Sequence, residues 1–514
     1  MNLNDPVKAK DELDRAVSSG SADAIARAAV ANIWPLYSAH AGALRSAIVG
    51  LPSPVLERHP MLKMLHPMTP VLARTTRPFK PLIYQDDART MSPEEVDFLT
   101  LVQMIAFRTS GDVTAALSYA RRLEDRILQT RVESRERTDG PLWFFHHQIG
   151  STLLAAGDTT RALLEFATSR QLGRFSIQRD AERMALGREA LAHAVRGSLG
   201  DAERALAAAK TAPMPTVAHV DSCRTSEATA AALIAVDRMS DDLDDALAAL
   251  DPYDTIELTW PFALLARARA FLARRQPEDA LEAIHLASDS HPAQQGSFAT
   301  DVVAATSIKA LLAIGDITLA RRIADENVDA GTLTRLATVR VALHDGRFDV
   351  AGHALRVLAA DQSLGPAQRA ESVLLGGWLE LARTDDIDRD TALQISRIAR
   401  KRDSRRLLAI MPRQLVDHVR ALLPSEPAAE FDAVTSGLAN FEMHPRPILT
   451  TGERRVLNAL PSHQTTAAIA ETFHVSPNTI KSQLQSLYRK LGSSTRDEAI
   501  KTASRLHLIG ADGD

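Results

Sequence analysis

A group of polar side chains near the end of the chain has the types and spacing needed to bind a polyanion. Asn478, Lys481, Ser482 and Gln485 recur at helical spacing, and no acidic residue lies among them. Asn and Gln side chains can bridge two hydrogen-bonding positions on a base edge, while Lys can reach guanine or a phosphate. The pattern therefore predicts a helix face that enters the major groove of double-stranded DNA.

The opposite face of the same segment is apolar and should hold the polar residues outward. We expect this helix to run over 476–491, with Ser476 as its N-cap and Pro477 at the first helical position. Gly492 suits the position that follows the last turn. The buried side is formed by residues spaced as one helix face requires, namely Ile480, Leu484, Leu487 and Leu491.

Three further helices are expected around this one. The first begins at Thr450, which pairs with Glu453 in an S/T-x-x-E capping box. The second begins at Thr465 or the next residue, and the fourth begins at Ser494 or the next residue. The turn 473–475 should bury its two apolar side chains between the second and third helices.

Residues along the segment 449–510 follow the pattern of a known family. The matching residues are Leu449-Thr450, Glu453, Val456-Leu457, Ile469-Ala470, Val475-Ser476, Thr479-Ile480-Lys481, Leu484, Tyr488, Lys490-Leu491-Gly492, Arg496 and Glu498-Ala499. The segment resembles the LuxR-type (FixJ/NarL-like) helix-turn-helix of bacterial transcription regulators. The resemblance implies a four-helix DNA-binding domain over 448–514 and a homodimer formed through the last helix.

The resemblance also implies roles for individual residues. Lys481 and Arg496 would contact DNA, and Thr479 would contact a phosphate. Taken with the polar face, the expected DNA-binding residues are Asn478, Thr479, Lys481, Ser482, Gln485, Lys490 and Arg496. No catalytic, cofactor-binding or metal-binding residue is expected.

Four positions depart from the family pattern. Gly452 stands where the family has Arg, His463 where it has Gly, Gln483 where it has His, and Ala467-Ala468 where it has a polar pair. We expect His463 to adopt a positive φ, at a cost of about 1 kcal/mol. Because the apolar pattern survives, the departures bear on sequence preference and affinity more than on fold.

The charge distribution supports a nucleic-acid partner for this segment only. The whole chain has a net charge of −4, but the part from residue 448 onward carries eight Lys and Arg against six Asp and Glu. The segment 476–505 alone contains six basic residues and two acidic ones, so its excess of positive charge is larger. Positive charge is therefore concentrated where a phosphate backbone would bind.

The long body before this segment contains an internal repeat. A Gly-Asp pair, or a similar pair, is followed five residues after its first member by Ala. The Gly should end one helix, the Asp should cap the next, and the small Ala should allow close packing. The pattern resembles tetratricopeptide repeats, whose period is about 34 residues, and implies a right-handed superhelix with a concave partner surface. Alternatively, the helices only bury one another. The motif ends at Ala116, Ala162, Ala205, Ala246, Ala280, Ala320 and Ala351.

The expected fold is therefore all-α, a tetratricopeptide-like α-solenoid followed by a four-helix LuxR-type helix-turn-helix domain. The basic run 397–406 is expected to be a solvated helix face. The expected boundaries are an N-terminal helical segment over 1–90, repeats over 91–423, a linker over 424–447 and the DNA-binding domain over 448–514. The linker is expected to contain one short helix around 430–438.

No enzymatic motif is evident. The chain lacks the Gly-Lys-Ser or Gly-Lys-Thr of a phosphate-binding loop. The adjacent His146 and His147 point in different directions on a helix, which favours structural roles, and Cys223 is expected to be a passive or buried thiol. Without a secretory signal or a long apolar stretch, we expect a cytoplasmic protein that does not enter the membrane.

These features favour a bacterial transcription regulator whose body senses a protein, peptide or small-molecule effector. The alternative is a helical-repeat scaffold whose C-terminal bundle binds protein instead of DNA.

Overall fold

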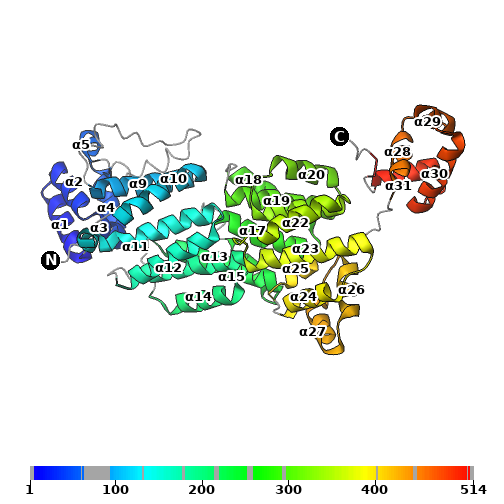
Figure 1. Ribbon diagram of the computed structural model, residues 1–514. Helices are drawn as coiled ribbons and strands as arrows, with labels where there is room; N and C mark the ends of the chain where they lie inside the picture. Colours follow the sequence, from blue (N-terminus) through cyan, green and yellow to red (C-terminus); the bar gives the residue numbers. More distant parts are fainter. Residues whose placement is uncertain are drawn as a thin grey trace.

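The computed structural model describes residues 5–59, 61–62, 93–129, 132–175, 180–213, 219–251, 259–291, 297–400, 403–443, 449–505 and 508–509. Within these ranges the regular elements are α-helices, and one isolated bridge joins Pro412 to Phe441. The prediction of an all-α fold is confirmed (Figure 1). No helix in these ranges is both long and apolar enough to cross a lipid bilayer.

The N-terminal helices have an apolar core of their own. Leu13, Leu36 and Ile48 are buried in it. Trp34 connects this core to that of the body, since its ring lies 5.5 Å from that of Phe145 in an edge-on contact. The helices are α1 (Pro6–Ser18), α2 (Ala22–Ala31), α3 (Ile33–Ala39), α4 (Ala41–Val49) and α5 (Ser53–Arg58).

The body is a succession of helical hairpins. From α9 to α23 each odd-numbered helix contacts the next odd-numbered one, and the even-numbered helices pack outside them. The odd-numbered helices therefore form an inner layer. Its helices are α9 (Pro93–Thr109), α11 (Val132–Ala155), α13 (Asp180–Arg196), α15 (Val220–Arg238), α17 (Trp260–Ala273), α19 (Phe298–Ile314), α21 (Thr332–His344) and α23 (Pro366–Thr384). The outer helices are α10 (Val113–Gln129), α12 (Thr159–Phe175), α14 (Leu199–Thr211), α16 (Leu243–Ala248), α18 (Pro277–Ser290), α20 (Ile317–Glu326), α22 (Phe348–Ala360) and α24 (Arg389–Arg400).

The repeated Gly-Asp…Ala motif does what its residues predict at most positions. Six of the seven alanines are buried, and Ala246 is partly buried. Gly157 adopts a left-handed conformation with φ of 84° between α11 and α12. Asp158 then caps α12 by accepting a hydrogen bond from the backbone N–H of Arg161 at 3.0 Å.

The third motif differs from the prediction. Gly200 lies inside α14, and the left-handed position between α13 and α14 is taken by Gly197, with φ of 80°. A Cβ atom on Gly197 would overlap Ala367, at the start of α23. The winding of the body therefore brings the end of α13 against a helix about 170 residues later in the chain, and only glycine fits at this contact.

The body ends in three helices, α25 (Arg405–Ala409), α26 (Arg413–Leu422) and α27 (Ser425–Thr435). The short helix α25 returns to the inner layer and packs against α15, α17 and α23. In α27, Phe431 and Val434 are buried in the same apolar core as α23 and α24. Much of the expected linker over 424–447 is therefore packed on the body, because Ala428, Phe431 and Val434 of this helix are buried.

Two side chains fasten the chain after α27 to the body. Asn440 donates to the carbonyl oxygens of Leu408 and Met411 at 2.8 and 3.0 Å. Arg405 donates to the carbonyl oxygens of Val434 and Ser436 at 3.2 and 2.9 Å.

The last four helices form a separate module with an apolar core of its own, at the red end of the ribbon in Figure 1. They are α28 (Thr451–Ala459), α29 (Thr466–Thr472), α30 (Pro477–Leu491) and α31 (Arg496–Arg505). The predicted four-helix arrangement of this segment is confirmed.

Candidate nucleic-acid interface

The helix α30 begins and ends where the sequence predicts. The Ser476 hydroxyl accepts a hydrogen bond from the backbone N–H of Thr479 at 3.1 Å, and Pro477 occupies the first helical position. Gly492 follows the helix in a left-handed conformation with φ of 60°. The helix is therefore fixed at both ends by local contacts.

One face of α30 is packed into the module. Ile480, Leu487 and Leu491 are buried, as predicted, whereas Leu484 is only half-buried at the edge of the core. These apolar contacts set the rotation of the helix about its axis and so decide which side chains face outward.

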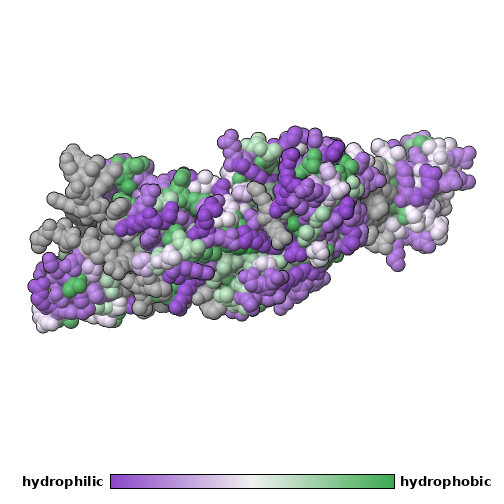
Figure 2. Space-filling model, turned by 90° about the horizontal axis from the view of Figure 1, so that it is seen from below, coloured by the Kyte–Doolittle hydropathy of each residue, from purple (hydrophilic) through white to green (hydrophobic). Residues whose placement is uncertain are grey.

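The outward face carries five of the seven predicted contact residues. They are all exposed, and α30 contains no acidic residue. In Figure 2 the module lies at the right-hand end, where hydrophilic residues cover much of the visible face. The five exposed residues are Asn478, Thr479, Lys481, Ser482 and Gln485.

Lys490, the sixth predicted contact residue, is directed into the module. Its Nζ atom lies 2.6 Å from Oε2 of Glu453, whose side chain is only 5% exposed. The same oxygen accepts from the backbone N–H of Thr450 at 2.7 Å, which completes the predicted capping box of α28. Burial alone would raise the pKa of Glu453, but hydrogen bonds from Lys490, Thr450 and Ser486 lower it to about 2.

Arg496, the seventh predicted residue, also makes internal contacts. Its guanidinium donates to the backbone carbonyl oxygens of Leu460 and His463, and to that of Gln464 at 3.3 Å. These carbonyls follow α28, so Arg496 ties the start of α31 to the end of the first helix of the module. The structure therefore brings five of the predicted residues together on the surface and places two in the scaffold.

Two expectations about the turns are wrong. His463 does not have a positive φ, because its backbone N–H continues the turn by donating to Ala459 at 3.1 Å. His474 takes the left-handed conformation instead, with φ of 54°. This turn also leaves the Val475 side chain 41% exposed, so only Phe473 packs against the core.

Two of the departures from the family pattern lie in contact. A Cβ atom on Gly452 would be 2.6 Å from Nε2 of Gln483, so any larger residue would displace that side chain. Gln483 is half-buried against the start of α28 and does not share the outward face. The small residue at position 452 therefore leaves the space that the Gln483 side chain occupies.

Arg489 is an exposed basic residue that the sequence-based selection omitted. It follows Gln485 by four positions and Ser482 by seven, which places it on the outward face of α30. The helical periodicity of the outward face therefore predicts Arg489, and not Lys490, as a contact residue.

Comparisons with known proteins agree with this geometry. Residues 447–503 match the family described as "Bacterial regulatory proteins, luxR family". The C-terminal module is a LuxR-type helix-turn-helix domain. It is similar to the "Probable transcriptional regulatory protein NarL" of Mycobacterium tuberculosis, from strains CDC 1551 / Oshkosh and ATCC 25618 / H37Rv, with 43% identity over 63 residues in each case.

The similarity is confined to the LuxR-type module. It covers 12% of this chain and 29% of each of the two relatives. The body from α9 to α27 lies outside the matched region.

Proposed function

We propose that this chain is a transcription regulator that binds double-stranded DNA through its LuxR-type module. The observation that carries this proposal is the exposed, acid-free face of a helix that is capped at both ends and held by its apolar side. Such a helix fits the major groove, where polar side chains reach the base edges. The matched family supports the same function.

We assign individual roles from chemistry and position. Asn478 and Gln485 would form paired hydrogen bonds with base edges, and Lys481 would reach guanine or a phosphate. Thr479, next to the helix N-terminus, would donate to a phosphate oxygen. Ser482 would contact a base edge or a phosphate, and Arg489 would add a phosphate contact.

Lys490 and Arg496 would act through the fold. Lys490 neutralises Glu453, and Arg496 holds the end of α28. We assign both to positioning α30, although Arg496 would regain the role implied by the family if its guanidinium left the carbonyls on binding DNA.

The proposal includes two further elements. Two copies of the chain would pair through α31, which gives a dimer that binds two half-sites. The body would bind an effector and thereby control the module. We assign no reaction to the chain, and binding to a bacterial chromosome would place it in the cytoplasm.

The salt dependence of DNA binding tests the central claim. Genomic fragments retained by the full chain supply a labelled duplex, and fluorescence anisotropy then measures its affinity at several salt concentrations. Lys481→Ala should weaken binding about tenfold and reduce the salt slope by about 0.9, because one fewer counterion is released. Lys210→Ala, which removes an exposed lysine on α14 of the body, serves as the matched control and should change neither quantity.

The opposite result would favour the scaffold alternative. If the folded wild-type chain retains no duplex at low salt, or if Lys481→Ala binds with an unchanged slope, α30 is not the DNA-binding element.

A further inference from the structure

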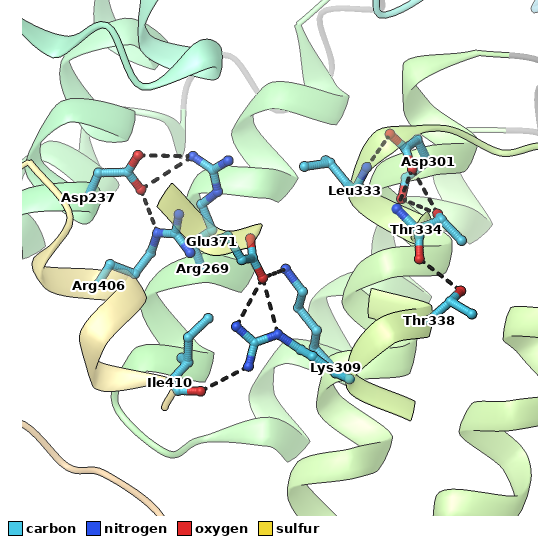
Figure 3. A network of polar contacts seen from close by, with 11 residues as sticks. Asp237, Arg269, Asp301, Lys309, Leu333, Thr334, Thr338, Glu371, Arg406 and Ile410 are labelled. Carbon is cyan, nitrogen blue, oxygen red and sulfur yellow. Dashed lines mark hydrogen bonds and ion pairs between the residues drawn. The ribbon is translucent and has the colours of Figure 1, made fainter. Parts of the chain in front are cut away.

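The inner layer of the body contains a buried row of ionisable side chains. Six successive odd-numbered helices, α15 to α25, contribute one each, and the inward return of α25 brings the last beside the first (Figure 3). The residues are Asp237, Arg269, Lys309, Arg340, Glu371 and Arg406, and Figure 3 labels all of them except Arg340.

The two carboxylates are each shared by two cations. Asp237 accepts from Nη1 of Arg269 at 3.3 and 3.4 Å and from Nε of Arg406. Oε1 of Glu371 lies 3.0 Å from Nζ of Lys309 and accepts from Nη2 of Arg340 at 3.0 Å. Each acid therefore neutralises only one of the two positive charges that it contacts.

The row consequently has an excess of positive charge. Four cations face two carboxylates, and the side chains of Asp237, Arg269, Glu371 and Arg406 are each no more than 8% exposed. A further buried acid, Asp301, interacts with Lys309, and both of its oxygens accept hydrogen bonds from Leu333 or Thr334. With Asp301 included, four cations face three carboxylates, so positive charge is still in excess. Buried charge without a counterion is costly, so an anion at this place would be stabilising.

Hydrogen-bond donors remain available in the same row. Within the part of the chain that the structure describes, Nη1 and Nη2 of Arg406 donate to no acceptor, because its contacts involve Nε alone. Arg269 likewise uses only Nη1. A guanidinium with both terminal nitrogens free can bind two oxygens of one anion at once.

The two residues that carry these donors help to line a small cavity. Arg269, Lys309, Glu371 and Arg406 lie around it, and its volume is about 30 Å³. That volume exceeds the about 10–15 Å³ that a cavity needs to hold one water molecule, so the cavity has room for a small polar group. Apolar side chains complete the lining and could pack against an organic group, namely Leu265, Leu272, Leu333 and Ile410.

We propose that this cavity binds a small oxyanion, either free or as the head group of a small ligand, between Arg269, Lys309 and Arg406. The chemistry shared by the candidate ligands is a phosphate, sulfate or carboxylate group with one or two negative charges. Glu371 also lines the cavity, but Lys309 and Arg340 already hold one of its oxygens.

The lowered pKa of Lys309 is consistent with a site for an anion in this cavity. Burial lowers the pKa of Lys309 to about 8, although the attraction of Glu371 acts in the opposite direction. An anion beside the ammonium group would favour its charged form and raise that pKa.

The position of the cavity also suggests how an anion could act. Arg406 lies on α25, and its neighbour Arg405 holds the backbone at Val434 and Ser436, on the path to the LuxR-type module. A ligand that fixes α25 would strengthen this attachment. This regulatory consequence rests on the proposed function, whereas anion binding itself does not.

Calorimetric titration of the full chain tests the site directly. Inorganic phosphate and sulfate form one arm, acetate and succinate form another, and chloride at equal ionic strength is the reference. We expect one binding site per chain and a rise in melting temperature that depends on the anion, since a ligand that binds only the folded state stabilises it. A response in the first arm identifies a tetrahedral oxyanion, and a response in the second identifies a carboxylate.

Two variants and a matched control locate the site. Arg406→Met removes the free donors, while Ala305→Leu fills the cavity from α19 without changing any charge. Each should weaken anion binding at least tenfold. Arg224→Met, which removes an exposed arginine of α15, should bind as the wild type does. If circular dichroism shows that Arg406→Met does not fold, Ala305→Leu decides the question.

Other outcomes would overturn the inference. Wild-type protein that gives no heat and no melting shift with all four anions has no such site. Unchanged binding by folded Ala305→Leu would place the anion elsewhere. Lys481→Ala separates this inference from the proposed function, because it should lose DNA affinity and keep anion binding.

Discussion

The LuxR-type module and the body place similar basic side chains in opposite environments. In the module, Lys481 and Arg489 are exposed on α30 without an acid on the same helix. In the body, Arg269 and Arg406 are buried and share the carboxylate of Asp237. An exposed cation costs little and is available to a large polyanion, whereas a buried cation needs a counterion within the fold.

The difference shows that basic composition alone does not indicate a partner. The run 397–406 contains both types of residue within ten positions. Arg397 and Arg400 are exposed, as expected for a solvated face, but Arg406 is 3% exposed and lies in the inner layer. The expectation is therefore wrong for Arg406, because the chain turns inward at α25.

Among the changes that test this comparison, we expect the largest loss of stability from removing the buried carboxylate of Asp237. Asp237→Ala leaves two guanidinium groups buried beside each other and should lower the free energy of unfolding by about 3–5 kcal/mol. Asp432→Ala breaks a pair with Arg420 that is about half exposed and should cost less than about 1 kcal/mol. Urea unfolding of the full chain measures both, and equal losses would show that burial makes no difference.

A smaller effect is expected from Arg496→Ala. Loss of its hydrogen bonds to the carbonyls that follow α28 should destabilise the module by about 1.5–3 kcal/mol. Hydrogen exchange of peptides from α28 and α31 in the full chain would show this as faster exchange. The salt slope of DNA binding by the folded fraction should stay unchanged, and a fall of about 0.9 would instead make Arg496 a phosphate contact.

The buried carboxylate of the module should respond to pH. The pKa of Glu453 is about 2 in the folded module, below its ordinary value of 4.5. Its stabilising contribution is therefore complete above about pH 4.5 and is lost as the pH falls toward 2. Hydrogen exchange of α28 and α30, corrected for intrinsic rates, should show progressive opening over this range. Glu453→Gln should make the opening nearly independent of pH, and a variant that keeps the full pH response would refute the assignment.

The smallest expected effect is a difference in the salt slope of DNA binding between variants of Arg489 and Lys490. Arg489→Ala should reduce the salt slope of DNA binding by about 0.9, because an exposed phosphate contact is lost. Lys490→Ala should leave the slope unchanged and speed the exchange of α28, since Glu453 loses its partner. Anisotropy measured side by side on the two variants checks this, and the reverse result would restore Lys490 as the contact.

Local rules explain the features that the sequence predicts correctly. The capping box of Thr450 and Glu453, the N-cap Ser476 and the buried alanines of the repeat depend on residues a few positions apart. Five of the seven predicted contact residues are exposed for the same reason, because the helical period and the apolar face fix their direction.

The features that sequence reasoning missed depend on distant contacts. Arg406 and Asp237 are separated by 169 positions, and no local pattern brings them together. Gly452 and Gln483 meet only after α28 packs on α30. The inward contacts of Lys490 and Arg496 likewise involve partners more than thirty positions away.

Each residue of the buried row lies on a different helix, so the net charge of the row depends on which of these helices the body contains. Loss of one of these helices would therefore remove the charge that its residue contributes to the row. Removing α17 and α18, for example, would delete Arg269 and lower the net positive charge of the row by one. Among bodies built in this way, the sign of the residue on each helix, and not the number of hairpins, would set the charge of the anion that we propose to bind there.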